Sequence, residues 1–425
     1  MSRTAQPAQG LFGYAAYGLL GLPLAMSALP VYVQIPAYYT TQLGMPLALT
    51  GWILFLARLL DVLQDPLLGY LIDRIQGRMV VWFASAGLML ALAFYGLWLP
   101  PVSATLLPLW LAAMLVLAYS AHSMLNIAYL SWGARIDQGK DTHRAMLKLA
   151  AWREGSGLAG VILASTIPGF IFLSQPARIA SQLTSYCVAF GLILAAAIAA
   201  LLSMAPPWQR VRSRPGGFAG PWANVFSNRA FTRLLVPYFI NAISVSVPAT
   251  LVIFFINDRL QASHYTPAFL SVYFIAAALG LPCWVTCARK WGVSLTWRLG
   301  MLLAVVAFAS AGSLGTGQTG GFFVICFLSG LALGADLALP PVLLAQVIDI
   351  NAPPAAYYSI WTLLGKLALA ASGLTLPLLA WFDYHPGTPA GMELAWAYAG
   401  VPCILKLVAL LLLTRLTSFK EMRPV

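Results

Sequence analysis

Residues 46–72 read PLALTGWILFLARLLDVLQDPLLGYLI, an apolar stretch that is long enough to cross a bilayer and yet carries charged side chains in its middle. A helix rises about 1.5 Å per residue, so about 20 apolar residues cross the roughly 30 Å of hydrocarbon in a membrane. Similar runs recur along the chain without the alternation of polar and apolar residues that barrel strands require. The sequence therefore predicts an all-α membrane protein.

The composition excludes a soluble globular protein. Of the 425 residues, 60% are hydrophobic and 8% are charged, and the mean hydropathy is +0.82. A soluble domain has about 25% charged residues. Prolines at positions 23, 30 and 36 predict a bend in the first membrane helix. We predict twelve transmembrane helices, at residues 12–40, 46–72, 79–99, 104–131, 147–173, 183–204, 230–257, 266–288, 294–314, 320–348, 356–382 and 391–415.

A break in the pattern divides these helices into two groups of six. Residues 206–217 read PPWQRVRSRPGG, which is basic and rich in helix-breaking residues. We therefore predict an N-terminal six-helix half at 1–204, a cytoplasmic linker at 205–229, and a C-terminal six-helix half with a short cytoplasmic tail at 230–425. Paired six-helix halves are typical of the major facilitator fold of secondary transporters.

The net charge of +12 follows the topology of the predicted helices. Basic residues gather in every second loop and in the linker, whereas the other loops hold little beyond Arg178 and Arg259. This is the positive-inside pattern, with both chain termini in the cytoplasm. We predict a multi-pass protein of the cell inner (cytoplasmic) membrane and no nucleic-acid partner. A cleavable signal is not expected, and the five cysteines, all in apolar runs, are expected to pack rather than bind a metal.

Helix two carries the strongest cluster of buried charges, formed by Arg58, Asp61 and Asp65. Such a charge costs about 2.5–3.5 kcal/mol at a helix centre, so it persists where it pairs, faces water or binds a ligand. The spacing of three and four residues places all three side chains on one helix face. Two carboxylates one turn apart offer ligands for a small cation, or a pair that shares a proton. One arginine cannot neutralise both; the structural alternative is a buried ion pair plus a charge near the helix end.

Two further charges lie near mid-membrane depth. Lys366 in helix eleven lies at a depth similar to that of Asp61, and we expect it to pair with a carboxylate and to release that carboxylate when a cation arrives. Asp336 in helix ten is expected either to pair with Lys366 or to contact the substrate, and the sequence leaves both roles open.

Helix four has one polar face, on which Tyr119, His122, Ser123 and Asn126 recur at helical spacing. This face suits a water-lined cavity, and hydrogen bonding between helices explains it equally well. The candidate substrate contacts of the whole chain are Tyr32, His122, Asn126, Arg153, Asp336, Trp361 and Thr362.

The helix-two residues resemble the signature of a known transporter family. The pattern Arg58-x-x-Asp61-x-x-x-Asp65-Pro66, followed by Gly69-Tyr70-Leu71-Ile72-Asp73-Arg74, is similar to helix two of the glycoside–pentoside–hexuronide:cation symporters, the melibiose permease family. Shorter similarities extend the resemblance over most of the chain, at Tyr38-Tyr39-Thr40, Asn126-Ile127-Ala128-Tyr129 and Gly365-Lys366.

This resemblance implies a twelve-helix symporter that works as a monomer and is driven by Na⁺, Li⁺ or H⁺. It implies cation ligands at Asp61, Asp65 and Ser123, charge partners at Arg58 and Lys366, and a substrate-side arginine at Arg153. The end of helix two also offers Asp73 and Arg74 for gating contacts between helices.

The chain departs from the sugar site of the family it resembles. Ala25 stands where those symporters carry a sugar-binding Asp in helix one, Asn126 stands at the helix-four sugar-binding Asp, and Leu130 replaces the aromatic residue that follows. The cation half of the resemblance is intact and the galactoside half is not, so the substrate differs or its affinity falls. Asp336 is a candidate replacement for the missing acids.

Several functions are compatible with these residues. We predict a secondary active transporter, a Na⁺- or H⁺-coupled symporter of a sugar or another small polar solute, working by alternating access. The alternatives are the same fold moving a lysolipid-like or other amphipathic solute, or a proton-coupled exporter. An intramembrane Mg²⁺-dependent prenyltransferase is disfavoured, because Ala57 replaces the expected Asn and Asp336 is far from Asp349. We expect no enzymatic activity and no cofactor beyond the coupling ion; the partners are the solute, the cation and membrane lipid.

Overall fold

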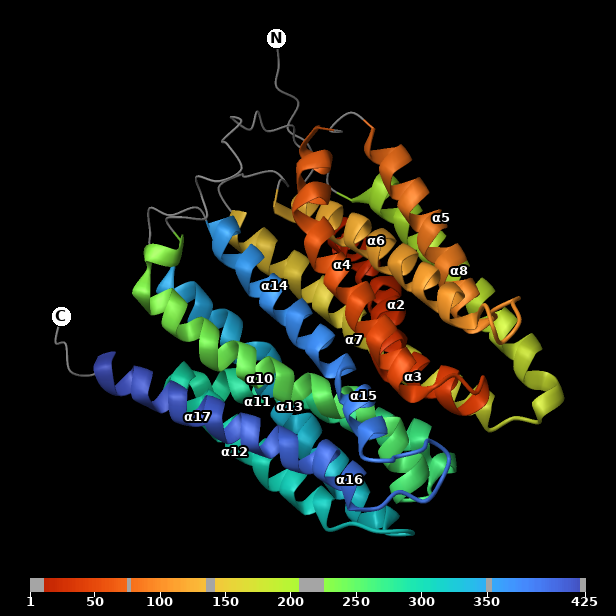
Figure 1. The fold of residues 1–425 in the computed structure, drawn as a ribbon. Coiled ribbons are helices and arrows are strands. Elements are labelled where there is room, and N and C mark those ends of the chain that lie inside the picture. Colours follow the sequence, from red (N-terminus) through yellow and green to blue (C-terminus); the bar gives the residue numbers. More distant parts are fainter. Residues whose placement is uncertain (1–10, 75–77, 135–141, 206–224, 349–353, 421–425) are drawn as a thin grey trace. The chain divides into compact units, whose positions relative to one another are not determined.

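The computed structural model describes residues 11–74, 78–134, 142–205, 225–348 and 354–420, and within these ranges it contains helices and no strand (Figure 1). The α-helices are α1 (Leu11–Leu19), α2 (Gly21–Val33), α3 (Ile35–Ala37), α4 (Leu47–Arg74), α5 (Met79–Trp98), α6 (Leu107–Ala134), α7 (Thr142–Phe172), α8 (Pro176–Met204), α10 (Arg229–Phe254), α11 (Thr266–Trp291), α12 (Val293–Gly312), α13 (Thr319–Val347), α14 (Pro354–Gly373), α15 (Thr375–Trp381), α16 (Met392–Ala395) and α17 (Val401–Lys420). Some of them are extended by short π-helical segments, at η1 (Tyr38–Gln42), η2 (Phe255–Arg259) and η4 (Trp396–Gly400), or by a 3₁₀-helical segment, at η3 (Ser263–Tyr265).

Twelve stretches of the described residues are long and apolar enough to cross a membrane, and each overlaps one predicted helix. Their surfaces expose large apolar side chains such as Leu109, Leu192 and Leu411, which suit contact with lipid tails. The prediction of an all-α membrane protein is confirmed. The stretches are Phe12–Val33, Leu47–Asp65, Met79–Trp98, Leu107–Gly133, Trp152–Phe172, Pro176–Met204, Arg229–Arg259, Ser263–Trp291, Val293–Gly312, Thr319–Val347, Tyr357–Trp381 and Met392–Arg415.

Several helix ends differ from the prediction for identifiable reasons. The first predicted helix is divided into α1, α2, α3 and η1, with Pro30 inside α2 and Pro36 in the first turn of α3. Proline has no backbone N–H and cannot continue the ladder of hydrogen bonds. The sixth helix begins at Pro176, because proline suits a first helical position, and Arg178 therefore lies in a helix rather than in a loop.

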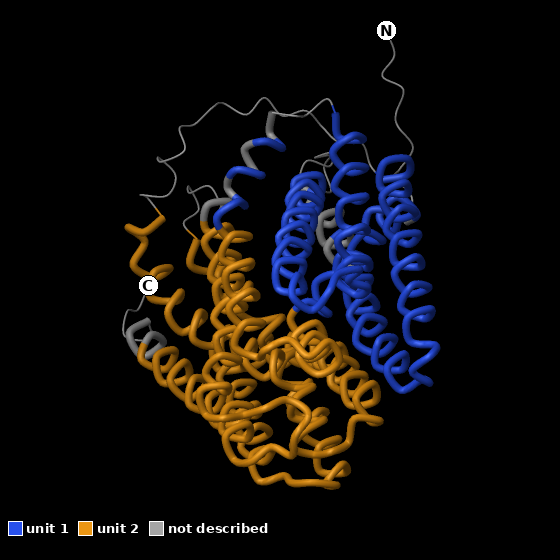
Figure 2. Tube along the Cα trace, turned by 45° about the vertical axis from the view of Figure 1, so that its right-hand side comes forward, with its two compact units in different colours: residues 1–31, 63–214 blue, residues 32–62, 215–425 orange. Residues whose placement is uncertain are grey.

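The contacts between residues divide the chain into two compact units (Figure 2). Unit 1 comprises Met1–Val31 and Leu63–Arg214, and unit 2 comprises Tyr32–Val62 and Pro215–Val425. Residues 32–62 thus group with the C-terminal residues, a feature that the sequence did not indicate. The division into halves at 1–204 and 230–425 stays a prediction, and residues 206–224 of the predicted linker lie outside the described residues.

Unit 1 is held by aromatic packing and by close helix contacts. α5 packs against α6 and α8, and α1 packs against α7 and α8. The Phe94 and Phe190 rings stack with their centroids 4.0 Å apart. At Gly160 of α7 a β-carbon would overlap the Leu22 carbonyl oxygen of α2, so glycine allows these two backbones to touch.

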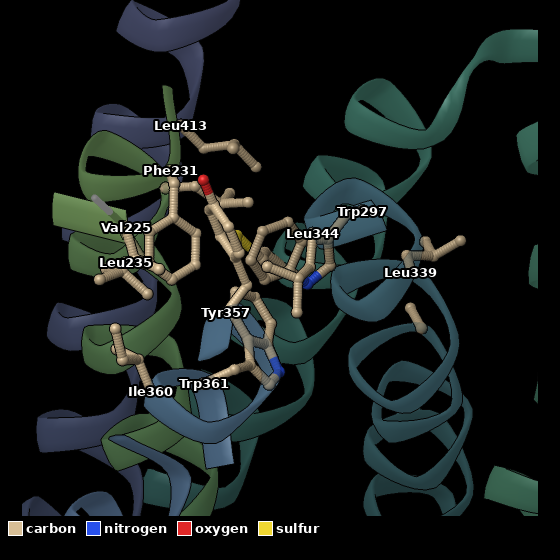
Figure 3. Close-up of a cluster of buried hydrophobic side chains, with 14 residues drawn as sticks. Val225, Phe231, Leu235, Trp297, Leu339, Leu344, Tyr357, Ile360, Trp361 and Leu413 are labelled. Atoms are coloured by element: carbon tan, nitrogen blue, oxygen red, sulfur yellow. The ribbon is translucent and has the colours of Figure 1, made fainter. Parts of the chain in front are cut away.

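Unit 2 has a buried core where α10, α12, α13, α14 and α17 meet (Figure 3). α13 packs between α11 and α12, and α17 packs against α10 and α12. The largest side chains of this core are Phe231, Trp297, Tyr357 and Trp361. Because Trp297 and Trp361 carry ring N–H groups, the core can also position polar side chains at its edge.

Candidate functional site

A buried carboxylate in unit 2 is bound by two cations. Asp61 accepts a hydrogen bond at Oδ2 from Arg58 Nη1, at 3.2 Å, and forms an ion pair with Lys366 Nζ, at 3.1 Å, through the same oxygen. Arg58 lies one turn before Asp61 on α4, and Lys366 lies on α14. The predicted contact between Lys366 and the helix-two acid is therefore present. We call Arg58, Asp61 and Lys366 the cationic triad.

The accessible part of the cationic triad is positive. The Asp61 side chain is 1% exposed, whereas those of Arg58 and Lys366 are 11% and 17% exposed. The carboxylate is thus enclosed, and a molecule that approaches the triad meets the two cations first. In surroundings of low dielectric constant, a cationic surface attracts an anion more strongly than it would in water.

Two aromatic residues fix the helix that carries Lys366. Trp361 lies one turn before Gly365 and Lys366 on α14 and stacks on Tyr238 of α10, with ring centroids 3.4 Å apart. Trp361 is buried in the core of Figure 3, so packing accounts for it, and its role as a substrate contact stays a prediction. Thr362 is exposed and donates its hydroxyl hydrogen to the Tyr358 carbonyl of its own helix.

Asp336 pairs with a lysine that the sequence analysis missed. Lys406 Nζ of α17 lies 2.6 Å from Asp336 Oδ2 and 2.8 Å from Asn241 Oδ1. Asn241 Nδ2 and Trp297 Nε1 both donate to Asp336 Oδ1, at 3.0 and 2.9 Å. Of the two roles left open for Asp336, pairing with Lys366 is wrong, because Lys366 pairs with Asp61. Lys406 stands alone among apolar residues in the last predicted helix, and that isolation is the signal that could have found it.

A cavity adjoins the Asp336–Lys406 pair. The cavity is small, with room for about one water molecule, and both charged side chains line it. Tyr273 and Ser329 add polar groups to its wall, which is otherwise apolar. We call Asp336, Lys406, Asn241 and Trp297 the buried network; it and its cavity lie entirely within unit 2.

The polar face of helix four, now α6, lies in unit 1 and bonds to neighbouring helices. His122 Nδ1 lies 3.2 Å from the Ser27 hydroxyl of α2. Ser120 donates to Gln64 Oε1 at 2.7 Å. Ser123 is buried and Asn126 is half-buried. These contacts show the interhelical hydrogen bonding that the sequence offered as one explanation.

Arg153 lies deeper in its helix than predicted. α7 begins at Thr142, so Arg153 is about three turns in, although it stands at the start of the apolar span. It forms an ion pair with its neighbour Glu154 at 2.7 Å. Beside it, Tyr129 donates to the Tyr17 carbonyl and Tyr17 donates to the Tyr129 carbonyl, which ties α6 to α1.

The remaining predicted site residues are distributed between the units. Tyr32 is half-buried in unit 2, within electrostatic range of Arg58. Asp65 and Ser123 lie in unit 1, so their sharing of a cation with Asp61 stays a prediction. The side chains of Asp73 and Arg74, predicted to gate the transporter, lie outside the described residues.

A separate polar cluster closes one end of unit 2. The Tyr384 hydroxyl and the Gly387 N–H both donate to Asp258 Oδ2, and Arg259 donates to the Leu314 and Ala390 carbonyls. Burial and the neighbouring carboxylate raise the pKa of Tyr384 well above its usual range, so the hydroxyl keeps its proton and remains a donor. This cluster joins three loops and is structural. Across the described part of the chain, no three His, Cys, Asp or Glu side chains converge on a common metal position.

Comparison with known proteins gives a consistent result. Residues 14–418 match the family model described as MFS/sugar transport protein. The mouse (Mus musculus) sphingosine-1-phosphate transporter MFSD2B is 23% identical over 370 residues, which are 78% of this chain and 71% of that protein.

Solved structures share the fold at lower sequence identity. The nucleoside transporter NupG superposes with a TM-score of 0.69 at 12% identity, covering 97% of this chain and 100% of that one. A bacterial homolog of the human lysosomal transporter Spinster, in an inward-facing and unoccupied conformation, gives a TM-score of 0.63 at 16% identity, covering 98% and 96%. At these identities the likeness concerns the fold alone.

Proposed function

Because the chain belongs to the MFS/sugar transport protein family, and so to the major facilitator superfamily, we propose that it is a secondary transporter of an amphipathic, lysolipid-like solute with an anionic headgroup. The twelve apolar spans make it a multi-pass membrane protein. In this fold the solute binds near mid-membrane and is exposed to each side in turn.

The cationic triad is the observation that carries this proposal. Arg58 and Lys366 enclose the Asp61 carboxylate and remain partly exposed themselves, so the triad offers positive charge to a phosphate or carboxylate headgroup. Arginine suits such oxygens particularly well, because its planar guanidinium offers two parallel donors. The substitutions at Ala25 and Asn126, relative to the sugar symporters, also remove two acids that would repel an anion. The similarity to a sphingosine-1-phosphate transporter supports the same class of solute.

A second candidate is the cation-coupled symport of a sugar or another small polar solute. It is favoured by the pattern of Arg58, Asp61 and Asp65, which resembles the melibiose permease family. In that mechanism Na⁺ or H⁺ would bind the helix-two acids and displace Lys366. The two candidate functions predict uptake of different solutes, so a transport assay can distinguish them.

The setting of the protein completes the proposal. We infer that the chain acts in the inner membrane with both termini in the cytoplasm, as a monomer, and that transport rather than catalysis is its activity. The bilayer then surrounds the protein, and a lysolipid-like solute would enter the transporter from the bilayer.

Uptake by purified protein in proteoliposomes tests the proposal. We expect labelled sphingosine-1-phosphate, used as the anionic lysolipid probe, to be taken up, and melibiose not to be. Lys366→Ala should lower the initial uptake at least tenfold, equivalent to about 1.4 kcal/mol, because the headgroup loses a cation. Lys290→Ala is the matched control, since Lys290 is exposed in the last turn of α11 and should leave uptake unchanged.

The opposite pattern would support the second candidate. Accumulation of melibiose under a Na⁺ or H⁺ gradient, with no uptake of the lysolipid, overturns the proposed solute class. Equal uptake of the lysolipid by the Lys366→Ala protein would show that the triad does not bind the headgroup.

A further inference from the structure

The buried network has features that a purely structural ion pair does not need. Lys406 is 2% exposed, and it reaches Asp336 from a different helix, at 2.6 Å. Replacing such a pair by packed apolar residues is often neutral or stabilising, so stability alone does not explain its presence. Ionisable groups inside a membrane protein more often mark an ion or proton path.

The network is arranged so that Asp336 can change its protonation state without losing its other partners. Oδ1 accepts from Asn241 and Trp297, whereas Oδ2 accepts from Lys406. A protonated carboxyl still accepts two hydrogen bonds at its carbonyl oxygen. The Lys406 ammonium also has a second acceptor, Asn241 Oδ1, at 2.8 Å. Only one hydrogen bond, from Lys406 to Oδ2, must break.

The cavity gives this carboxyl an adjacent space. Asp336 and Lys406 line it together with Tyr273 and Ser329. The groups nearest Asp336 are Asn241 of α10, Tyr273 of α11, Trp297 of α12 and Lys406 of α17. Around Tyr273 lie three further titratable groups, Tyr32 of α2, Cys326 of α13 and Tyr398 of η4. Within this described set Lys406 is the one cation, and it contacts Asp336 directly.

Asp61 lacks this freedom. Two cations contact its carboxylate, and both favour its charged form, within a side chain that is 1% exposed. Asp258 is bound by a tyrosine hydroxyl and a backbone N–H at the end of its helix, away from the cavity residues. Among these buried carboxylates of unit 2, Asp336 is therefore the one that has a single cationic partner and an adjacent cavity.

We propose that Asp336 and Lys406 form a proton-binding site, in which a proton from the cavity binds Asp336 Oδ2 and frees the Lys406 ammonium toward the cavity. The proton comes from water, the Nζ–H···Oδ2 hydrogen bond breaks, and the ammonium keeps its three protons. The net charge of the pair rises from zero to +1. The use of that charge to attract an anionic solute rests on the proposed function; proton binding itself does not.

Infrared difference spectroscopy of the purified protein in lipid nanodiscs tests this site without any solute. As the pH is lowered, we expect a carbonyl band of a buried, protonated carboxylic acid. Asp336→Asn should abolish it. Lys406→Met should keep the band and make it stronger at a given pH, because the cation that stabilises the carboxylate is gone. Asp383→Asn is the matched control: Asp383 is exposed in a loop, its φ of 59° suits asparagine, and the band should remain.

Folding is checked separately, because Asp336→Asn leaves a buried lysine without its counter-ion. The double variant Asp336→Leu/Lys406→Met removes both charges and should unfold near the temperature of the unaltered protein, again without the band. A band that persists in Asp336→Asn, or that disappears in Asp61→Asn, overturns the proposal. So does a complete absence of the band from the unaltered protein. Because no solute is present, failure here leaves the uptake experiment to decide the proposed function independently.

Discussion

At the scale of single residues, Trp297 and Trp284 of unit 2 both donate a ring N–H to α13, but to different kinds of acceptor. Trp297 Nε1 donates to the Asp336 carboxylate at 2.9 Å, and Trp284 Nε1 donates to the Leu331 carbonyl at 2.7 Å. A hydrogen bond to a charged acceptor contributes about 1.5–3 kcal/mol, against about 0.5–1.5 kcal/mol for a neutral one. The same chemical deletion should therefore have unequal effects at the two positions.

We expect Trp297→Phe to lower the unfolding temperature in detergent more than Trp284→Phe does. Both substitutions remove one N–H and leave an aromatic ring; Trp297 is fully buried and Trp284 is partly buried, so the lost packing acts in the same direction as the lost hydrogen bond. The measurement is the thermal unfolding of the two variants beside the unaltered protein. Equal losses of stability would show that the carboxylate gains nothing special from Trp297.

The sequence predicted some of these residue contacts because they are local. Arg58 and Asp61 are three residues apart, and any helix brings them together. The comparison of depths along two helices predicted a carboxylate partner for Lys366, and the resemblance to the melibiose permease family implied that a helix-two acid was this partner. The partner of Asp336 could not be found in that way, because the sequence does not show which helices surround α13, and the structure brings Lys406 of α17 rather than Lys366 to Asp336.

At the scale of helices, close packing in unit 2 depends on glycine. α13 carries Gly330 and Gly334 one turn apart, where it meets α11. A β-carbon at Gly330 would overlap the Tyr273 carbonyl oxygen and lie 2.9 Å from the Ala276 β-carbon. The first of these neighbours is backbone, which cannot move aside without moving the helix. Such small-residue contacts are a common way for membrane helices to approach each other.

Gly330→Ala should therefore destabilise the protein by about 1–3 kcal/mol, as overpacking does in other cores. Gly320→Ala lies in the first turn of the same helix, where a β-carbon would meet nothing within 4 Å, and should be neutral or slightly stabilising. Thermal unfolding of both variants gives the comparison. The contact between α11 and α13 would be shown to be adaptable if Gly330→Ala unfolded at the same temperature as Gly320→Ala.

Helix boundaries also show what a sequence encodes. The number of membrane helices was predictable, because a run of about 20 apolar residues is a strong and local signal. The breaks within the first helix were indicated only as a bend, since proline removes a hydrogen bond without specifying how the chain then continues. The grouping of residues 32–62 with unit 2 depends on contacts far apart in sequence, and no local pattern indicates it.

At the scale of the whole molecule, the number of spans predicts which loops share a side of the membrane, and the distribution of charge predicts which side is cytoplasmic. Thr105 lies exposed just before α6, and Lys290 lies exposed in the last turn of α11. Five of the twelve apolar stretches separate them, from Leu107–Gly133 to Ser263–Trp291. An odd number of crossings places the two positions on opposite sides of the membrane. The positive-inside pattern further predicts that Lys290, beside Arg289, faces the cytoplasm.

Cysteine labelling tests both statements in one experiment. In a background with the five native cysteines replaced by serine, a membrane-impermeant maleimide should label Thr105→Cys in intact spheroplasts. It should label Lys290→Cys only after the membrane is permeabilised, because that position faces the cytoplasm. Labelling of both variants in intact spheroplasts would contradict the count of spans, since an even number would then separate them. The reverse pattern would keep the count and refute the orientation, because basic loops would then lie outside and both termini with them.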